Sequence, residues 1–163
     1  DRATYTYSMS EREFGRSRMK PLGINLKIEN RVEPDYSGTY AILAEKSSSY
    51  YYLTNVDNGA STKRLNSEEV NSLPEPGVTL DASKVWNVIK NNDGTYYIQS
   101  VENNYYLDHT SGNSAVLTEN IDDAVALTIL KEDEKYSISY KDSNSEIRNF
   151  VKNSSSAYFL TNN

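Results

Sequence analysis

Apolar and polar residues alternate with a period of two along most of the chain, and short polar segments separate the alternating runs. TYYIQSV at residues 95–101 is one such run, and YYLD at 105–108 is the next. Alternation of this kind, bounded by Asn, Asp, Gly and Ser, predicts β-strands with one buried and one solvated face. Asp93 and Gly94 before the first run predict a tight hairpin turn, because glycine takes positive φ without steric cost.

The same order of elements recurs along the chain: a strand, a tight turn, a strand that begins at Tyr, a polar turn, a strand, a turn and a fourth strand. Tyr96 and Tyr136 begin equivalent strands, and Trp86 and Leu127 occupy equivalent places in the strands before them. Tyr40 begins the equivalent strand of a first copy. The spacing of the last two copies, about 40 residues, is typical of an internal structural repeat. The expected repeats cover about residues 24–65, 84–120 and 124–163.

Three four-stranded repeats favour a β-trefoil. One unit of this length cannot bury its apolar face alone, whereas three around a pseudo-threefold axis can close a short barrel and cap it with hairpins. A β-sandwich with accidental self-similarity is the alternative, and propeller blades fit less well because three do not close a ring comfortably. The predicted fold is therefore all-β, a β-trefoil over residues 24–163. The positions expected in its core are Leu26, Ile28, Ile42, Leu53, Leu65, Trp86, Val88, Ile98, Leu107, Leu117, Leu127, Ile129, Ile138, Ile147, Phe150 and Leu160.

Two segments fall outside the repeat pattern. Tyr40 and Tyr96 lie farther apart than the repeat period, so the first repeat is followed by an insertion, expected at residues 66–83. The insertion is interpreted as the start of a short helix, with Ser67 as the N-cap, Glu68 and Glu69 in the first turn, and two prolines that end it. Residues 1–23 are expected to be an N-terminal extension or linker; their run ATYTYSM alternates and could form an extra strand.

Composition agrees with a thin-walled β domain. Hydrophobic residues make up 37% of the chain, and the mean hydropathy is -0.72, which is too polar for a thick-cored α/β enzyme. The 14 tyrosines suit half-buried strands, because a tyrosine hydroxyl can stay in water. The net charge of -6 argues against general nucleic-acid binding, which needs clustered cations. No apolar run is long enough to predict membrane insertion.

The supply of reactive side chains is small. The chain has no cysteine and a single histidine, His109, so thiol chemistry and a zinc site are not expected. His109 sits in a polar turn and is better explained as a turn residue than as a catalytic base. The adjacent acids at 68–69 and 122–123 are expected to face solvent rather than to oppose each other across a cleft, as a glycosidase requires. The predicted protein is not an enzyme and needs no cofactor or metal.

One stretch carries a family resemblance. GTYYIQSVENNYYLDHTSGNSAVLTEN, residues 94–120, resembles the repeat of ricin-B-like lectin domains, with a G-x-Y-x-I strand, a Y-L-D strand, a Gly/Asn-rich loop and a V-x-L strand. Fascin-like trefoils and repeats in surface proteins of Gram-positive bacteria have a similar layout. The lectin signature Q-x-W is missing from residues 122–130, and the first and third repeats lack the Asp that follows the third-strand aliphatic residue. The resemblance therefore implies the fold more strongly than it implies a sugar site. The matching positions are Gly94, Tyr96, Ile98, Leu107, Asp108, Gly112 and Leu117.

The resemblance implies a non-catalytic binding module of a secreted or cell-wall-attached bacterial protein that recognises carbohydrate weakly. The candidate ligand-binding residues are Asp108 and Asn113 for sugar hydroxyls, Tyr105 for stacking, and His109 at the edge of the site. Cross-strand tyrosine packing is the alternative explanation of the outward tyrosines. A second hypothesis is a structural or protein-binding domain of a surface adhesin with no sugar site, a variant being an isopeptide-cross-linked pilin fold. The expected partner is a glycan or a host or cell-surface protein, and the chain is expected to be a monomeric module of a larger extracellular protein.

Overall fold

The computed structural model describes residues 2–8, 25–59, 61 and 63–162, and for 2–8 and 25–31 it describes the backbone alone. The chain divides into two units, Asp1–Asp35 and Tyr36–Asn163. Regular structure in both units is almost entirely β-strand, so the predicted all-β class is confirmed.

The N-terminal unit contains an antiparallel hairpin of β1 (Arg2–Ser8) and β2 (Asn25–Arg31). The alternating run ATYTYSM therefore lies largely in a strand. The sequence assigns β2 to the first repeat, and in the structure β2 pairs with β1. Leu26 and Ile28, which the sequence places in the core, have side chains outside the described part of the chain.

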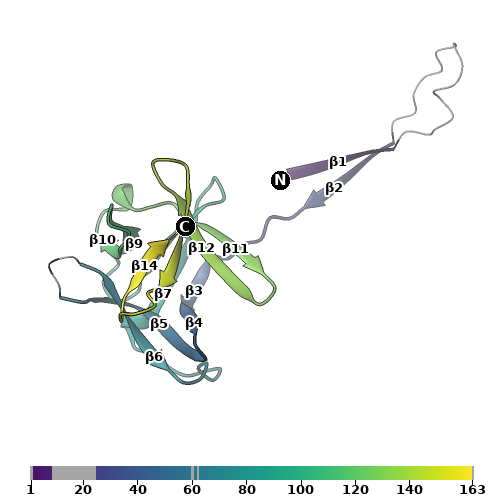
Figure 1. Ribbon diagram of the computed structural model, residues 1–163. Helices are drawn as coiled ribbons and strands as arrows, with labels where there is room; N and C mark the ends of the chain where they lie inside the picture. The colour runs from purple at the N-terminus through teal and green to yellow at the C-terminus, as the bar shows by residue number, and fades with distance from the viewer. Residues whose placement is uncertain (1, 9–24, 60, 62, 163) are drawn as a thin grey trace, which may run out of the picture. The chain divides into compact units, whose positions relative to one another are not determined.

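The second unit, Tyr36–Asn163, is the compact unit and contains three antiparallel sheets (Figure 1). Their strand orders are β10-β9-β8-β7-β3, β11-β12-β13-β14 and β4-β5-β6. Isolated backbone bridges join these sheets. Tyr96 of β8 bridges to Leu127 just before β11, Asn66 of β6 bridges to Tyr158 just before β14, and Ser114 just before β10 bridges to Leu160 of β14. The bounds are β3 Gly38–Ala41, β4 Leu43–Lys46, β5 Ser49–Asp57, β6 Leu65–Val70, β7 Val85–Lys90, β8 Tyr96–Ser100, β9 Tyr106–His109, β10 Ala115–Thr118, β11 Thr128–Glu132, β12 Lys135–Lys141, β13 Ile147–Lys152 and β14 Phe159–Asn162, with short 3-10 helices η2 Ala82–Lys84 and η3 Ile121–Asp123.

The predicted strands of the compact unit all contain strand residues, and the main error lies in the insertion. Residues 67–70 continue strand β6 and do not begin a helix. Glu69 faces Tyr51 across the β5–β6 pair, and the Ser67 hydroxyl donates a hydrogen bond to the Ala157 carbonyl oxygen at 3.0 Å. The cap-like pattern of this segment is overridden because its backbone groups pair with β5.

The predicted turn at Asp93–Gly94 is confirmed. Gly94 has φ of 85°, a conformation that favours glycine. The Asp93 carboxylate accepts hydrogen bonds from the backbone N–H and the hydroxyl of Thr95, at 2.9 and 2.6 Å. These bonds lower the pKa of Asp93, because they stabilise its charged form. A local polar side chain thus fixes the turn that aligns β7 with β8.

The register places equivalent residues of the three predicted repeats opposite one another in the same way. The Leu53 N–H donates to the Ile42 carbonyl oxygen at 2.8 Å. The residue that follows the isoleucine of each repeat pairs with the next strand: Leu43 with Tyr52, Gln99 with Tyr106, and Ser139 with Asn149. The period read from the sequence therefore corresponds to a repeated strand pairing. The buried apolar residues are Tyr52, Leu53, Leu65, Trp86, Val88, Tyr96, Ile98, Leu107, Ala115, Leu127, Ile129, Tyr140 and Phe159.

The predicted core is largely found, with two errors. Ile147 is 58% exposed, and Leu160 is only half-buried while its neighbours Phe159 and Thr161 are buried. A shift of one residue moves a side chain to the opposite face of a strand, so the apolar run at the start of β14 allowed two choices of face. The other predicted positions within the compact unit are buried or packed against the core cluster.

Candidate functional site

Asp108 and His109 are neighbours on β9 and point to opposite faces of the strand, because side chains alternate along it. Asp108 is half-buried, and burial raises the pKa of its carboxyl group; the backbone N–H groups of His109 and Val125 donate hydrogen bonds to it and partly offset this effect. The carboxylate is thus engaged with the protein's own backbone. Sequence adjacency did not bring these two candidate residues into one site.

Tyr105 does not offer a free hydroxyl. Its O–H donates a 2.6 Å hydrogen bond to Glu119 Oε1, and this bond raises the pKa of Tyr105. The β5–β6 hairpin has the same arrangement, where the Tyr51 O–H donates to Glu69 Oε1 at 3.1 Å. Both tyrosines therefore fit the alternative expectation, contacts across paired strands, better than they fit stacking on a ligand.

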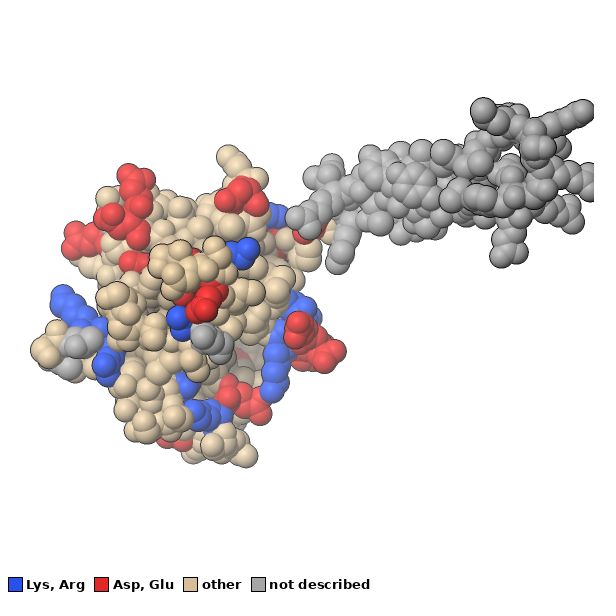
Figure 2. Space-filling model, turned by 45° about the horizontal axis from the view of Figure 1, so that its top comes forward, with Lys and Arg blue, Asp and Glu red and all other residues tan. Residues whose placement is uncertain are grey.

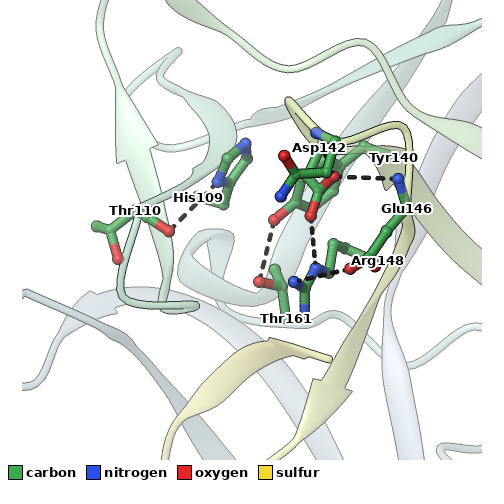
Figure 3. A network of polar contacts seen from close by, with 8 residues as sticks. His109, Thr110, Tyr140, Asp142, Glu146, Arg148 and Thr161 are labelled. Carbon is green, nitrogen blue, oxygen red and sulfur yellow. Dashed lines mark hydrogen bonds and ion pairs between the residues drawn. The ribbon is translucent and has the colours of Figure 1, made fainter. Parts of the chain in front are cut away.

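The His109 ring stacks on the buried Tyr140 ring, with centroids 4.0 Å apart and planes 13° apart. Figure 3 shows this stack beside a polar network that links β12 and β13. The Tyr140 O–H donates to Thr161 Oγ1 at 3.1 Å, and Arg148 Nε donates to Asp142 Oδ2 at 2.9 Å. The His109 ring therefore packs between two sheets, which favours a structural role for this residue.

The Asp142–Arg148 pair has a consequence for stability at low pH. Hydrogen bonding to Arg148 lowers the pKa of Asp142 in the folded protein. Its stabilising effect is therefore fully present above the unfolded pKa of about 3.9 and is lost as pH falls through the lower folded pKa. We expect Asp142→Asn to be less stable than wild type at pH 7 and to show a flatter decline below pH 4. Urea unfolding from pH 7 to pH 2 measures this, with the exposed Glu132→Gln as control; parallel curves for wild type and Asp142→Asn would refute it.

Asn113 is the predicted site residue that does line a cavity. The Arg64 cavity has a volume of about 320 Å³ and lies where residues of all three predicted repeats meet. Asn113 has φ of 62°, and its carbonyl oxygen accepts the Thr161 N–H at 2.8 Å, which ties the loop before β10 to β14. The lining residues are Arg64, Gly112, Asn113, Ser114, Tyr158, Leu160, Thr161 and Asn162.

Arg64 and Tyr158 form one wall of this cavity. The guanidinium carbon lies 4.3 Å from the centroid of the Tyr158 ring, a cation–π contact. Arg64 Nε donates to Ser114 Oγ at 3.2 Å. Because a guanidinium carries five N–H donors, donors remain for a ligand hydroxyl or carboxylate. Sequence reasoning missed both residues, since Arg64 and Tyr158 lie in the first and third repeats and only strand pairing joins them.

A second cavity, the Lys152 cavity, has a similar volume of about 320 Å³. Lys152 Nζ lies 4.6 Å from the centroid of the Tyr51 ring and donates to the Asn153 and Ser156 carbonyl oxygens at 2.9 and 2.6 Å. Burial lowers the pKa of Lys152, and nearby Lys46 lowers it further. The face of the tyrosine and the ammonium group are thus occupied by each other. The lining residues are Tyr51, Ser67, Glu69, Lys152, Ser154, Ser155, Ser156 and Ala157.

The described residues offer little other site chemistry. They contain no group of three or more His, Asp or Glu side chains placed to hold a metal ion. Asp122 and Asp123 lie in η3, where the Asn120 side chain caps the turn. On the face drawn in Figure 2, acidic and basic side chains of the compact unit are interspersed. Within the described ranges, no helix is both long and apolar enough to cross a membrane.

Comparison with known proteins adds no assignment: no protein-family model, curated protein or solved structure matches the chain. The candidate site therefore depends on its own geometry, and the Arg64 cavity is the place where a predicted residue, an aromatic ring and a cation meet.

Proposed function

We propose that the compact unit is a β-trefoil and serves as a non-catalytic binding module that recognises carbohydrate weakly through the Arg64 cavity. The observation that carries the proposal is the composition of the cavity wall, where Asn113 lies with the stacked pair of Arg64 and Tyr158. Asn113 can accept from and donate to sugar hydroxyls. The cavity volume is at the lower end of the range for ligand pockets, about 300–1,000 Å³.

The trefoil part of the proposal is supported by the strand pairing that recurs after the isoleucine of each repeat. The binding part implies one small, open site with few polar contacts. A site of this kind binds with a dissociation constant of about 1 mM, close to -4 kcal/mol. Useful avidity then requires repeated display, as on a cell surface or beside similar modules. An extracellular or wall-attached location is proposed on this ground and on the resemblance of residues 94–120 to lectin repeats.

A glycan array followed by NMR titration tests the proposal. The array includes acidic sugars, because the Arg64 guanidinium can pair with a ligand carboxylate. We expect amide shifts at Asn113 and Ser114, and a loss of affinity of about tenfold or more, roughly 1.4 kcal/mol, in Tyr158→Ala and Arg64→Ala. Tyr105→Phe, outside the cavity, is the control and keeps the affinity. If no sugar at tens of millimolar shifts these amides, the carbohydrate proposal fails.

The second candidate is a structural or protein-binding domain of a surface adhesin with no sugar site. The hydrogen bonds from Tyr105 to Glu119 and from Tyr51 to Glu69 favour it, because the outward tyrosines then brace hairpins and do not hold a ligand. Binding to an immobilised matrix protein that sugars do not inhibit, together with no sugar response in the titration, would select this candidate.

A further inference from the structure

The Arg64 cavity lies at the start of the last strand of each predicted repeat, β6, β10 and β14. Each of these strands begins with a buried apolar residue: Leu65, Ala115 and Phe159. The residues directly before them are Arg64, Ser114 and Tyr158, and all three line the cavity. Because the site uses the equivalent position of every repeat, the compact unit forms it once and not once per repeat.

The three equivalent positions carry different chemistry, and two of them hold the third. Arg64 is the one charged residue among the described residues that line the cavity. Its Nε donates to the Oγ of Ser114, which is 2% exposed, and its guanidinium lies against the Tyr158 ring. The planar guanidinium is therefore held by one edge and one face.

The two terminal amino groups of Arg64 are the donors that remain. Within the described part of the chain, no carboxylate forms an ion pair with Arg64, and Ser114 Oγ is the one acceptor of its side-chain N–H groups. Asp57 lies opposite Leu65 in the β5–β6 pair, but its carboxylate accepts the Gly59 N–H at 2.9 Å. The half-buried guanidinium thus lacks an opposite charge, which a ligand can supply.

We propose that the ligand of the Arg64 cavity is a sugar that carries a carboxylate, with both carboxylate oxygens bound by the terminal amino groups of Arg64. This inference rests on the proposed function and narrows it to acidic sugars. The parallel N–H groups at the end of a guanidinium form a fork that fits the two oxygens of one carboxylate. A sulfate ester presents three terminal oxygens, of which the fork satisfies two, and no second cation is present among the described lining residues.

A pair of sugars that differ only in the carboxylate tests this inference. Methyl glucuronide and methyl glucoside are titrated separately into the protein, and the amides of Asn113 and Ser114 are followed by NMR. We expect both sugars to shift these amides, and the glucuronide to bind about tenfold or more tightly than the glucoside. Raising the salt concentration from about 0.01 M to about 1 M should weaken binding of the glucuronide and leave binding of the glucoside unchanged.

Three variants assign the preference to the Arg64 fork. Arg64→Gln should bind the two sugars equally, and Arg64→Lys should keep a preference of no more than about threefold, because an ammonium group has no planar fork. The control is Lys63→Gln, which removes a neighbouring exposed charge that does not line the cavity, and it should keep the full preference. Amide spectra show whether each variant is folded, and the wild-type comparison of the two sugars stands without them.

The possible failures are distinguishable from one another. Equal binding of the two sugars at Asn113 and Ser114 would overturn this inference and leave the proposed carbohydrate function standing, whereas no response to any sugar would overturn both. Methyl glucoside 6-sulfate binding at least as tightly as the glucuronide would overturn the choice of a carboxylate. Acetate binding as tightly as the glucuronide would show that the sugar ring contributes nothing, and the ligand would then not be a sugar.

Discussion

Replacing Trp86 with alanine is expected to lower the free energy of unfolding by about 4–5 kcal/mol, since large-to-small changes of aromatic residues in cores cost about 3–5 kcal/mol. Trp86 is fully buried in the cluster of apolar residues that the sheets share. Its indole Nε1 donates a 3.0 Å hydrogen bond to the Leu53 carbonyl oxygen, which belongs to another sheet. Alanine removes the packing and leaves that buried carbonyl without its donor, a loss of about 1–3 kcal/mol by itself.

Urea denaturation followed by far-UV circular dichroism measures this effect, because the variant has no tryptophan fluorescence. Trp86→Phe separates the two contributions, since it keeps most of the ring volume and removes the hydrogen bond. The matched control is Ile89→Ala on the same strand, where the side chain is 38% exposed and the expected loss is below about 1 kcal/mol. A Trp86→Ala loss no larger than that of Ile89→Ala would show that the core is not centred on this residue.

The repeat period and the strands were predictable from the sequence because both depend on local signals. Alternation with period two and polar turns such as Asp93–Gly94 specify strand and turn without long-range information. The helix start expected at Ser67 failed because its signal was weak and local, whereas the backbone pairing of β6 with β5 involves many hydrogen bonds. The pairing of β2 with β1 could not be predicted, because an alternating run does not say which strand it will pair with.

The candidate site was predictable only in part, because a site depends on register. Asn113 was chosen for its polar side chain in a Gly/Asn-rich loop, and it does line a cavity. Arg64 and Tyr158 carried no signal in sequence, since their contact requires the Asn66–Tyr158 bridge between β6 and the start of β14. Tyr105 was expected to stack on a ligand, but the pairing of β9 with β10 extends to place Glu119 within reach of its hydroxyl.

Equivalent tyrosines of the repeat are expected to differ strongly in their contribution to stability. Tyr96→Ala should lower the free energy of unfolding by about 3–5 kcal/mol, because a nearly fully buried ring leaves a cavity. Its hydroxyl oxygen also accepts the Tyr36 N–H at 3.2 Å. Tyr136→Ala should cost less than about 1 kcal/mol, because that ring is 57% exposed. Sequence alone gives the two residues the same place in the repeat, so the difference reports how deeply the fold buries each ring.

The two variants are compared by urea unfolding under identical conditions. Tyr96 pairs with Lys90 of β7 and bridges to Leu127 just before β11, and strands on both sides account for its burial. Equal losses for both variants would mean that the Tyr136 ring is as buried as the Tyr96 ring in solution.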